Sequence, residues 1–454
     1  MAHAAKRPTR LRSHDPCRTP RVPSQPPRET LRLTMPQAAQ SKVPQRRSQA
    51  QPQLVLAALA RAALVTLLHT TLPCLAVATA IAADSNVSPA PLSLRPPEYL
   101  MLGGTVLDVG DYAVPTVADW NRDGRKDLVV GYRPADKIAL FLNTGTATNP
   151  QLAYAGNLQA GGFDIMVAGG SGCGAPAPWV GDFDGDADPD LLVGSAPDGT
   201  VILFRNNSTN TTPVLANGTR LALWNGDPLT VGTYATPCFS DWDGDAIPDL
   251  ICGAGDGTVF FFKNIGSAKS PLFSAGLRLL ADGKQLSLGS RAVPRLCDWD
   301  NDGLIDLIAS SSTGVYWCRN YGTTTSPTLA KPVPLTAPIS SGQIVPVNTS
   351  NRMRMDLADW DGDSLPDLIL GNTEGTICWF QSYRFAITML TRSADGQTVI
   401  RWNSSPYLFY SVVTGPSVTT CKDVVATGIT SGGTMTSWTN RFIRLQQFFR
   451  IRTP

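Results

Sequence analysis

Five nine-residue segments of the 454-residue chain hold oxygen-bearing side chains at a fixed spacing. Each segment has aspartate, or once asparagine, at its first, third, fifth and ninth positions. In a tight loop the first, third and fifth side chains lie on one side, the seventh residue can add a backbone carbonyl, and the ninth closes the shell. The candidate metal ligands are Asp119, Asn121, Asp123, Asp127, Asp182, Asp184, Asp186, Asp190, Asp241, Asp243, Asp245, Asp249, Asp298, Asp300, Asp302, Asp306, Asp359, Asp361, Asp363 and Asp367.

This pattern predicts calcium, which takes about six to eight hard oxygen ligands in flexible geometry. The five segments contain 20 of the 34 acidic residues that follow residue 83, and carboxylates packed so closely repel one another unless a cation lies between them. Magnesium, or solvated turns without a metal, are the alternatives. All three histidines precede residue 83, which excludes His-ligated zinc and a Ser-His-Asp triad from the rest of the chain.

The acidic segments must be positioned by a repeated β unit. Their first aspartates recur every 57 to 63 residues, and an apolar stretch, a glycine-containing turn and a second apolar stretch follow each of them. β-Branched and aromatic runs between turn residues indicate strands, and no helical period is evident. About four strands in about 60 residues is the content of a propeller blade.

We therefore predict an all-β fold, a β-propeller of about five four-stranded blades over residues 99–383. The first strands of this region are expected to complete the fifth blade, which would close the ring. Two further degenerate blades are the less favoured alternative. Alternating runs at 398–402, 407–413 and 448–452 predict a small β-sandwich-like domain over 384–454.

An aromatic residue fills the second position of every acidic segment. One interpretation is a set of platforms for sugar stacking, and the favoured one is core packing between blades. These residues are Trp120, Phe183, Trp242, Trp299 and Trp360. Nearby, Cys238 and Cys252 flank the third segment symmetrically, and they form either a disulfide across one hairpin or two buried thiols.

The acidic segments and the Asp-Leu strands after them resemble FG-GAP or VCBS repeats, the calcium-loop repeats of integrin α-subunit propellers and of many secreted bacterial proteins. The resemblance implies up to five calcium ions at the acidic positions above. The first site is expected to be the weakest, because Asn121 replaces an aspartate and Arg122, Arg125 and Lys126 crowd it. Integrins resemble a seven-blade version, which leaves the blade number open.

The N-terminal region resembles a targeting sequence. Residues 1–34 are predicted to be disordered or an over-extended start, and 35–83 combine basic residues, an apolar run and small residues as a signal peptide does. An uncleaved membrane anchor is the alternative reading. Residues 84–98 are expected to be a linker, and the protein is expected to be secreted or at the cell surface.

Residues 84–454 hold 26 basic and 34 acidic residues, so a nucleic-acid partner is not expected. The predicted function is a calcium-binding, non-enzymatic adhesion module for an extracellular protein or carbohydrate. We expect no catalytic residues, no organic cofactor, and no membrane contact except through an uncleaved signal anchor. The alternative is a polysaccharide lyase or hydrolase on a propeller scaffold, for which Glu98 and Glu374 are the only glutamates after residue 83.

Overall fold

The computed structural model describes residues 91–167, 174–208, 211–348, 352–392, 397–415, 423–441 and 448–452. Every regular element in these ranges is a β-strand. None of the described residues forms a helix of the length and apolar character that crossing a membrane requires. The predicted disordered start (1–34) and signal peptide (35–83) lie outside the described residues.

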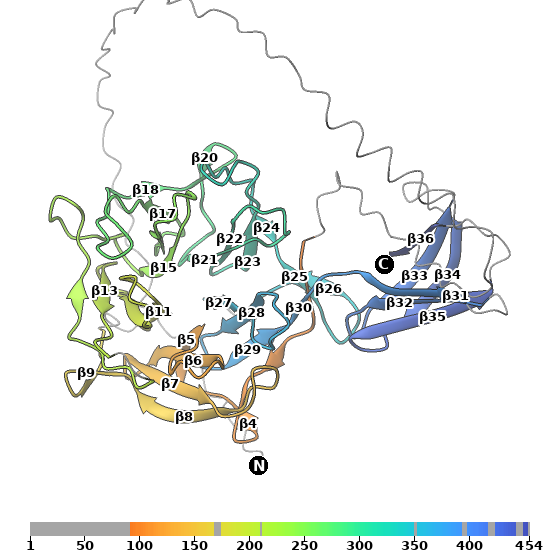
Figure 1. The fold of residues 1–454 in the computed structure, drawn as a ribbon, viewed down its shortest axis with the longest axis horizontal. Helices are drawn as coiled ribbons and strands as arrows, with labels where there is room; N and C mark the ends of the chain where they lie inside the picture. The colour runs from red at the N-terminus through yellow and green to blue at the C-terminus, as the bar shows by residue number, and fades with distance from the viewer. Residues whose placement is uncertain are drawn as a thin grey trace, which may run out of the picture. The chain divides into compact units, whose positions relative to one another are not determined.

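Five sheets follow one another along the chain, each formed mainly by an antiparallel meander of neighbouring strands (Figure 1). The first blade contains β5 (Asp111–Ala118), β6 (Asp127–Arg133), β7 (Lys137–Asn143) and β8 (Leu152–Asn157), extended by β3 (Met101–Leu102) and β4 (Thr105–Val106). The second contains β11 (Ala177–Gly181), β12 (Asp190–Gly194), β13 (Val201–Phe204) and β14 (Thr219–Arg220). The third contains β15 (Thr236–Ser240), β16 (Asp249–Gly253), β17 (Val259–Phe262) and β18 (Leu277–Arg278).

The last two blades repeat the plan, with one exception at the outer edge. The fourth contains β21 (Val293–Cys297), β22 (Asp306–Ser310), β23 (Val315–Cys318) and β24 (Val333–Pro334). The fifth contains β27 (Arg354–Ala358), β28 (Asp367–Gly371) and β29 (Ile377–Phe380), and its outer strand is β2 (Glu98–Tyr99) from the start of the described chain. Short hairpins and pairs lie between the blades: β1 (Ser93–Leu94) with β30 (Ser382–Tyr383), β9 (Gln159–Ala160) with β10 (Phe163–Asp164), β19 (Leu280–Ala281) with β20 (Lys284–Gln285), and β25 (Thr336–Pro338) with β26 (Ile344–Pro346).

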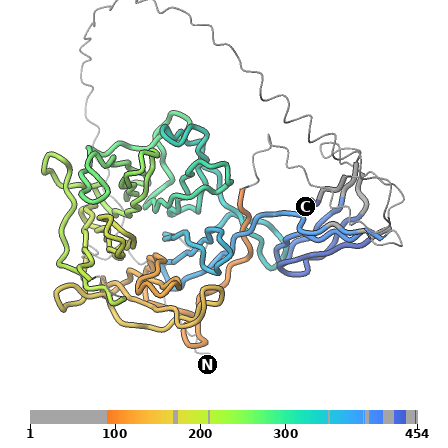
Figure 2. Tube along the Cα trace, viewed as in Figure 1, coloured from red at the N-terminus to blue at the C-terminus, as the bar shows by residue number. Residues whose placement is uncertain are grey.

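The ring is closed. The innermost strands β5, β11, β15, β21 and β27 each contact the next one, and β27 contacts β5. The coloured tube in Figure 2 passes through the blades in sequence order. The prediction of a five-bladed, all-β propeller is therefore confirmed, as is closure by an N-terminal strand in the fifth blade.

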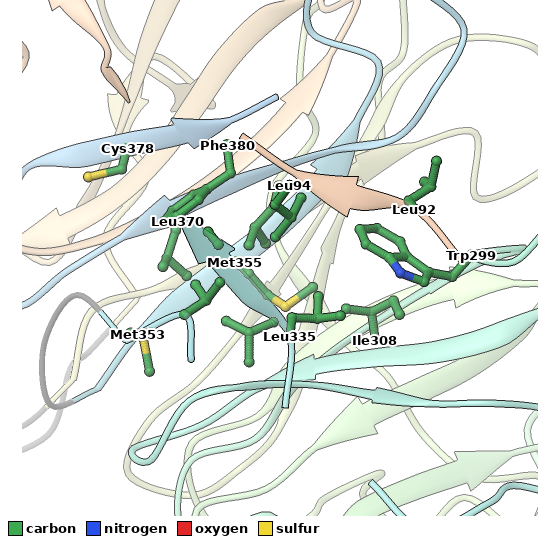
Figure 3. Close-up of a cluster of buried hydrophobic side chains, with 14 of the residues drawn as sticks. Leu92, Leu94, Trp299, Ile308, Leu335, Met353, Met355, Leu370, Cys378 and Phe380 are labelled. Carbon is green, nitrogen blue, oxygen red and sulfur yellow. The ribbon is translucent and has the colours of Figure 1, made fainter. Parts of the chain in front are cut away.

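The core of the propeller lies between blades. One cluster of buried hydrophobic side chains fills each of the five interfaces between neighbouring blades. Between the fourth and fifth blades, Leu335, Met355 and Phe380 pack with Leu92 and Leu94 (Figure 3). Leu92 and Leu94 fall in the segment expected to be a linker, so this part of it is packed.

Each interface cluster contains one of the aromatic residues from the second loop position, which confirms their assignment to the core. Trp120 packs between the first and second blades, Phe183 between the second and third, and Trp299 between the fourth and fifth. All five aromatic residues are 5% exposed or less. An aromatic ring buried in this way offers no face for stacking on a sugar.

The two cysteines of the third blade are free thiols. Cys238 pairs with Ile251 and not with Cys252, so the two thiols stand one residue out of register. Successive side chains of a strand point to opposite faces. Cys238 accordingly packs against the fourth blade and Cys252 against the second.

A buried ion pair joins the innermost strands. The Arg295 guanidinium on β21 pairs with Asp356 on β27, and both residues are 5% exposed. Asp356 also accepts hydrogen bonds from the Thr116 hydroxyl (3.1 Å) and the Val117 amide (2.6 Å) of β5. Arg295 donates to the Pro237 carbonyl of β15 at 3.2 Å. One pair of charges thus connects four of the five blades.

The C-terminal region forms two three-stranded antiparallel sheets. One contains β31 (Ile387–Arg392), β32 (Gln397–Asn403) and β35 (Met435–Arg441), and the other β33 (Phe409–Gly415), β34 (Asp423–Thr430) and β36 (Phe448–Arg452). Both sheets contribute to one hydrophobic cluster, in which Trp402 and Tyr410 meet edge to face.

The buried ion pair leads to a prediction about stability. Replacing Arg295 by alanine leaves the Asp356 carboxylate buried without its cation, which we expect to cost about 3–5 kcal/mol of the free energy of unfolding. The measurement is urea-induced unfolding. Arg278, which makes an exposed pair with Asp256, provides the control: Arg278→Ala is expected to cost less than about 1 kcal/mol. Equal losses in the two variants would contradict the structural role given to Arg295.

Candidate metal centres

The five acidic loops occupy the same place in every blade. Each connects the innermost strand to the second strand, and the residues that flank it are paired, as Ala118 is with Asp127. The first aspartate organises the turn with its side chain. In the third loop, Asp241 accepts hydrogen bonds from the backbone amides of Gly244 (2.8 Å) and Ala246 (2.9 Å). Both of these residues have positive φ, which suits Gly244 and strains Ala246.

The ninth aspartate is fully buried in all five loops. One of its oxygens accepts the backbone N–H of the aromatic residue at the second position, and the other accepts a backbone N–H at the end of the third strand. In the second loop, Asp190 accepts from Phe183 at 3.0 Å and from Asn206 at 2.7 Å. This carboxylate therefore ties the loop, the second strand and the third strand together.

Carboxylate oxygens converge in four of the loops. In each group, one oxygen from every member lies within 4.8 Å of the others, which fits ligands about 2.3–2.6 Å from a shared ion. The groups are Asp182 with Asp184 and Asp190, Asp241 with Asp243 and Asp249, Asp298 with Asp300 and Asp302, and Asp359 with Asp361 and Asp367. The remaining predicted ligands of these loops, Asp186, Asp245, Asp306 and Asp363, lie outside the groups.

Each of the four groups contains a buried carboxylate oxygen without a hydrogen-bond partner. These oxygens belong to Asp184, Asp243, Asp300 and Asp359. A buried anionic oxygen without a partner is costly, and a bound cation would satisfy it. The donor set therefore fits a hard metal ion: it consists of oxygens, it is anionic, and it is incomplete in the protein alone.

The first loop is different. Among the described residues its carboxylates are not part of any such group. Arg125 in the seventh position pairs with Asp123, while the Asn121 amide donates to the same carboxylate at 2.9 Å. Arg122 pairs instead with Asp188 of the second loop. A metal site at Asp119, Asn121, Asp123 and Asp127 remains a prediction.

Three of the four groups also face a basic side chain from the end of the third strand. Arg205 pairs with Asp184 at 2.7 Å, Lys263 with Asp243 and Asp245, and Arg319 with Asp300 at 2.7 Å. In the fifth blade the corresponding residue is Gln381, whose amide donates to Asp361. The carboxylate group of the fifth loop therefore faces a neutral side chain at this position.

Sequence reasoning missed these basic residues and the asparagine that follows each of them. Asn264, for example, bonds through its backbone to Asp249, while its side-chain oxygen accepts the amides of Gly266 and Leu272, each at 3.0 Å. Asn143, Asn206 and Asn320 do the same. A recurring asparagine 14 to 16 residues after the ninth aspartate was the available signal.

Burial disfavours the charged form of the ninth aspartates. It raises the pKa of Asp190, Asp249 and Asp306 to about 6, and that of Asp367 to about 7. Backbone hydrogen bonds to these carboxylates act in the opposite direction but are outweighed. The loops therefore hold carboxylates that are poorly stabilised as anions when no cation is bound.

Comparison with known proteins places repeats of one family on these loops. The FG-GAP-like repeat matches residues 119–193, 182–252 and 298–370, and each match begins at the first aspartate of an acidic loop. No curated protein matches the chain in sequence.

Several solved structures match the chain at low similarity. The Photorhabdus luminescens Tc holotoxin pore matches with 13% identity and a TM-score of 0.34 over 71% of this chain, which spans only 16% of that toxin chain. An Agrocybe aegerita lectin described as recognising non-reducing terminal N-acetylglucosamine matches with 15% identity and a TM-score of 0.31, covering 78% of this chain and 96% of the lectin. AofleA from Arthrobotrys oligospora matches with 12% identity and a TM-score of 0.35, over 76% and 92% of the two chains.

The raised pKa values predict how stability depends on pH when divalent cations have been removed. The folded protein binds protons at Asp190, Asp249, Asp306 and Asp367 that the unfolded chain, with carboxyl pKa values near 4, releases. This stabilisation is complete below about pH 4 and is lost as the pH rises through 6–7, so the melting temperature should be higher at pH 5 than at pH 8. The sequence after residue 83 contains no histidine, so no histidine of this region contributes to the pH dependence.

The measurement is thermal unfolding of chelator-treated protein between pH 5 and pH 8. The Asp367→Asn variant is the control, because it lacks the group with the highest of these pKa values and should show a smaller pH dependence. A melting temperature that rises from pH 5 to pH 8 would contradict the prediction.

Proposed function

Because this chain carries FG-GAP-like repeats on a five-bladed propeller, we propose that it is a calcium-stabilised, non-enzymatic binding module that acts outside the cell. The observation that carries the proposal is the partnerless buried carboxylate oxygen in each of four loops. Calcium supplies the missing positive charge and accepts the irregular oxygen sets that these loops offer. Magnesium fits them less well, because it demands near-octahedral geometry and dehydrates reluctantly.

Calcium in these loops would act on the blade interfaces. The aromatic residue between neighbouring blades follows the first aspartate directly, and its amide donates to the ninth. In the second, third and fifth loops, where the group includes both the first and the ninth aspartate, an ion bound to both would fix the backbone on both sides of that aromatic residue. The metal would thus stiffen the disc as a whole, and a rigid disc can present a preformed surface to a protein or carbohydrate ligand.

The proposed localisation outside the cell and the proposed partners rest on the sequence pattern. The basic, apolar and small-residue sequence at 35–83 supports export. Calcium sites of this loop-based type suit the high calcium concentration outside cells. The proposed partners are an extracellular protein or carbohydrate, and membrane contact would arise only from an uncleaved anchor.

Calcium binding can be counted directly. We expect four ions per chain at near-neutral pH, and a melting temperature that rises on adding calcium by an amount equivalent to about 2.7 kcal/mol for each site at a hundredfold excess over Kd. Asp243→Asn should reduce the number of bound ions by one, because it removes a carboxylate from the group of the third loop. Asp227→Asn, in an exposed turn outside the loops, is the matched control and should leave the count unchanged.

The basic side chains predict an order of affinities among the loops. Lys263→Gln should tighten the third site by removing a competing cation, and Gln381→Lys should weaken the fifth by adding one. Calcium titration by calorimetry measures both. If calcium neither binds nor raises the melting temperature, the acidic loops are ordinary turns and the metal part of the proposal fails.

Binding and catalysis can be separated with one assay. We expect saturable binding to an immobilised glycan or extracellular protein, weakened by chelation and without release of product. Turnover of a polysaccharide that is lost in Glu374→Gln would instead favour the lyase or hydrolase alternative. The Asp227→Asn variant again controls for loss of an acidic side chain outside the loops.

A further inference from the structure

A cluster of arginine and tyrosine side chains lies where the innermost strands begin. We name the set Tyr112, Tyr234, Arg291, Arg352 and Arg354 the basic mouth. The first four have left-handed backbone, with φ between 52° and 92°, and three of them stand two residues before an innermost strand. Four residues in this sparsely populated conformation, at corresponding places in four blades, indicate a constrained local structure.

The members of the basic mouth contact one another across blades. The Arg291 guanidinium lies 4.5 Å from the ring centre of Tyr234 and donates to its hydroxyl at 3.3 Å. Arg352 lies 5.5 Å from the ring centre of Tyr112 and donates to that hydroxyl. Arg133, at the end of β6, covers the Tyr112 ring at 5.4 Å. Aromatic rings stabilise these cations but carry no compensating negative charge.

Arg354 sits at the centre of the cluster and is only 7% exposed. Its guanidinium donates to the backbone carbonyls of Met353 (3.3 Å) and Arg291 (3.4 Å). No carboxylate of the described residues lies within ion-pairing distance of Arg354 or Arg291. Burial, with the positive charges of Arg291 and Arg352, lowers the pKa of Arg354. A buried guanidinium beside two others is expensive unless an anion joins it.

The charged residues that follow the basic mouth along the innermost strands include a carboxylate partner. Two residues beyond Arg354 on β27, Asp356 pairs with Arg295 and neutralises it. At the mouth, Asp136 lies 4.0 Å from Arg133 at the rim, and no carboxylate of the described residues pairs with Arg291 or Arg354. Positive charge is therefore compensated inside the ring by Asp356, whereas Arg291 and Arg354 at its entrance have no carboxylate partner among the described residues.

We propose that the basic mouth binds a tetrahedral oxyanion, a sulfate or phosphate group, either as the free ion or as an ester on a larger ligand. The planar fork of arginine matches the oxygen edges of such a group, and three guanidinium groups suit a multiply charged anion better than a single carboxylate. The tyrosine hydroxyls add donors at the same entrance.

This site is separate from the acidic loops. In the register of β5 and β6, Asp111 stands opposite Arg133 at the start of β5. At the other end, next to the first acidic loop, Ala118 stands opposite Asp127. Eight residues at about 3.3 Å each separate the two ends by roughly 25 Å. The proposal extends the proposed binding function by naming a ligand class, and it does not require calcium in the loops.

The test is calorimetric titration of the full chain with inorganic sulfate, at constant ionic strength maintained with chloride. We expect one saturable site, with at least tenfold weaker binding in Arg352→Gln. Arg352 is half-buried, so this variant should fold, and Arg354→Lys, which keeps the charge but loses the fork, should give a smaller loss. Arg220→Gln, on an exposed strand of the second blade, is the matched control and should bind as the parent does.

A second titration distinguishes the two sources of the anion. Tighter binding of glucose 6-sulfate than of inorganic sulfate identifies an ester on a larger ligand, whereas preference for the inorganic ion identifies the free anion. Absence of saturable heat, or equal affinity in Arg352→Gln and the parent, overturns the proposal. Calcium-dependent melting of the same samples reports on the loops independently, so failure of one site does not count against the other.

Discussion

A carboxylate held in full burial at the base of a hairpin is the constraint on which each blade depends. The ninth aspartate of every acidic loop accepts one backbone amide from the aromatic residue at the second position and another from the end of the third strand. It therefore fixes the loop, two strands and the interface aromatic residue together. A hydrophobic residue at this position would bury as well but would leave two amides unsatisfied. Aspartate meets this requirement, because its two carboxyl oxygens can accept both amides.

The charge on the two ends of the innermost strands is opposite in sign. Aspartates gather where these strands end, and arginines gather where they begin. At the acidic end, basic side chains such as Lys263 supply part of the compensation from within the protein. Inside the ring, Arg295 and Asp356 compensate each other. The fold thus contains one charge pair that is matched inside the ring, acidic loops that are matched in part, and a basic cluster for which we propose an anionic ligand.

The fold could be predicted from the sequence because its repeat is strong. The aspartates at fixed spacing, and the aromatic residue between the first two, mark the same turn five times, so blade number, strand order and core aromatic residues all followed from one pattern. The convergence of aspartates could be predicted for the same reason. The ion pair between Arg295 and Asp356 was not predicted, because neither residue recurs at the same position in the other blades. The two residues meet because the ring places β21 beside β27.

The basic mouth escaped prediction in the same way. Arginine is a residue usually found at the surface, so nothing in the sequence indicated that Arg291, Arg352 and Arg354 form a cluster. Packing of the fourth blade against the fifth brings them together. The positions of Cys238 and Cys252 depend on strand register in a similar way. Their symmetric spacing suggested that they stand opposite each other, but the register of β15 and β16 is shifted by one residue, so the two thiols face different interfaces. Features that depend on repeated local sequence were accessible, and features that depend on unique long-range pairing were not.

Closure of the ring by β2 has a consequence for how the protein is made. Glu98 pairs with Trp379, so the outer strand of the fifth blade leaves the ribosome about 280 residues before its partner. At a synthesis rate of about 5–20 residues per second, this strand waits roughly 15–60 s with its backbone groups unpaired. During that interval the first four blades form an open arc whose last edge is exposed to strand exchange with another chain. Synthesis of the fifth blade, rather than folding of any earlier blade, is the event that removes this edge.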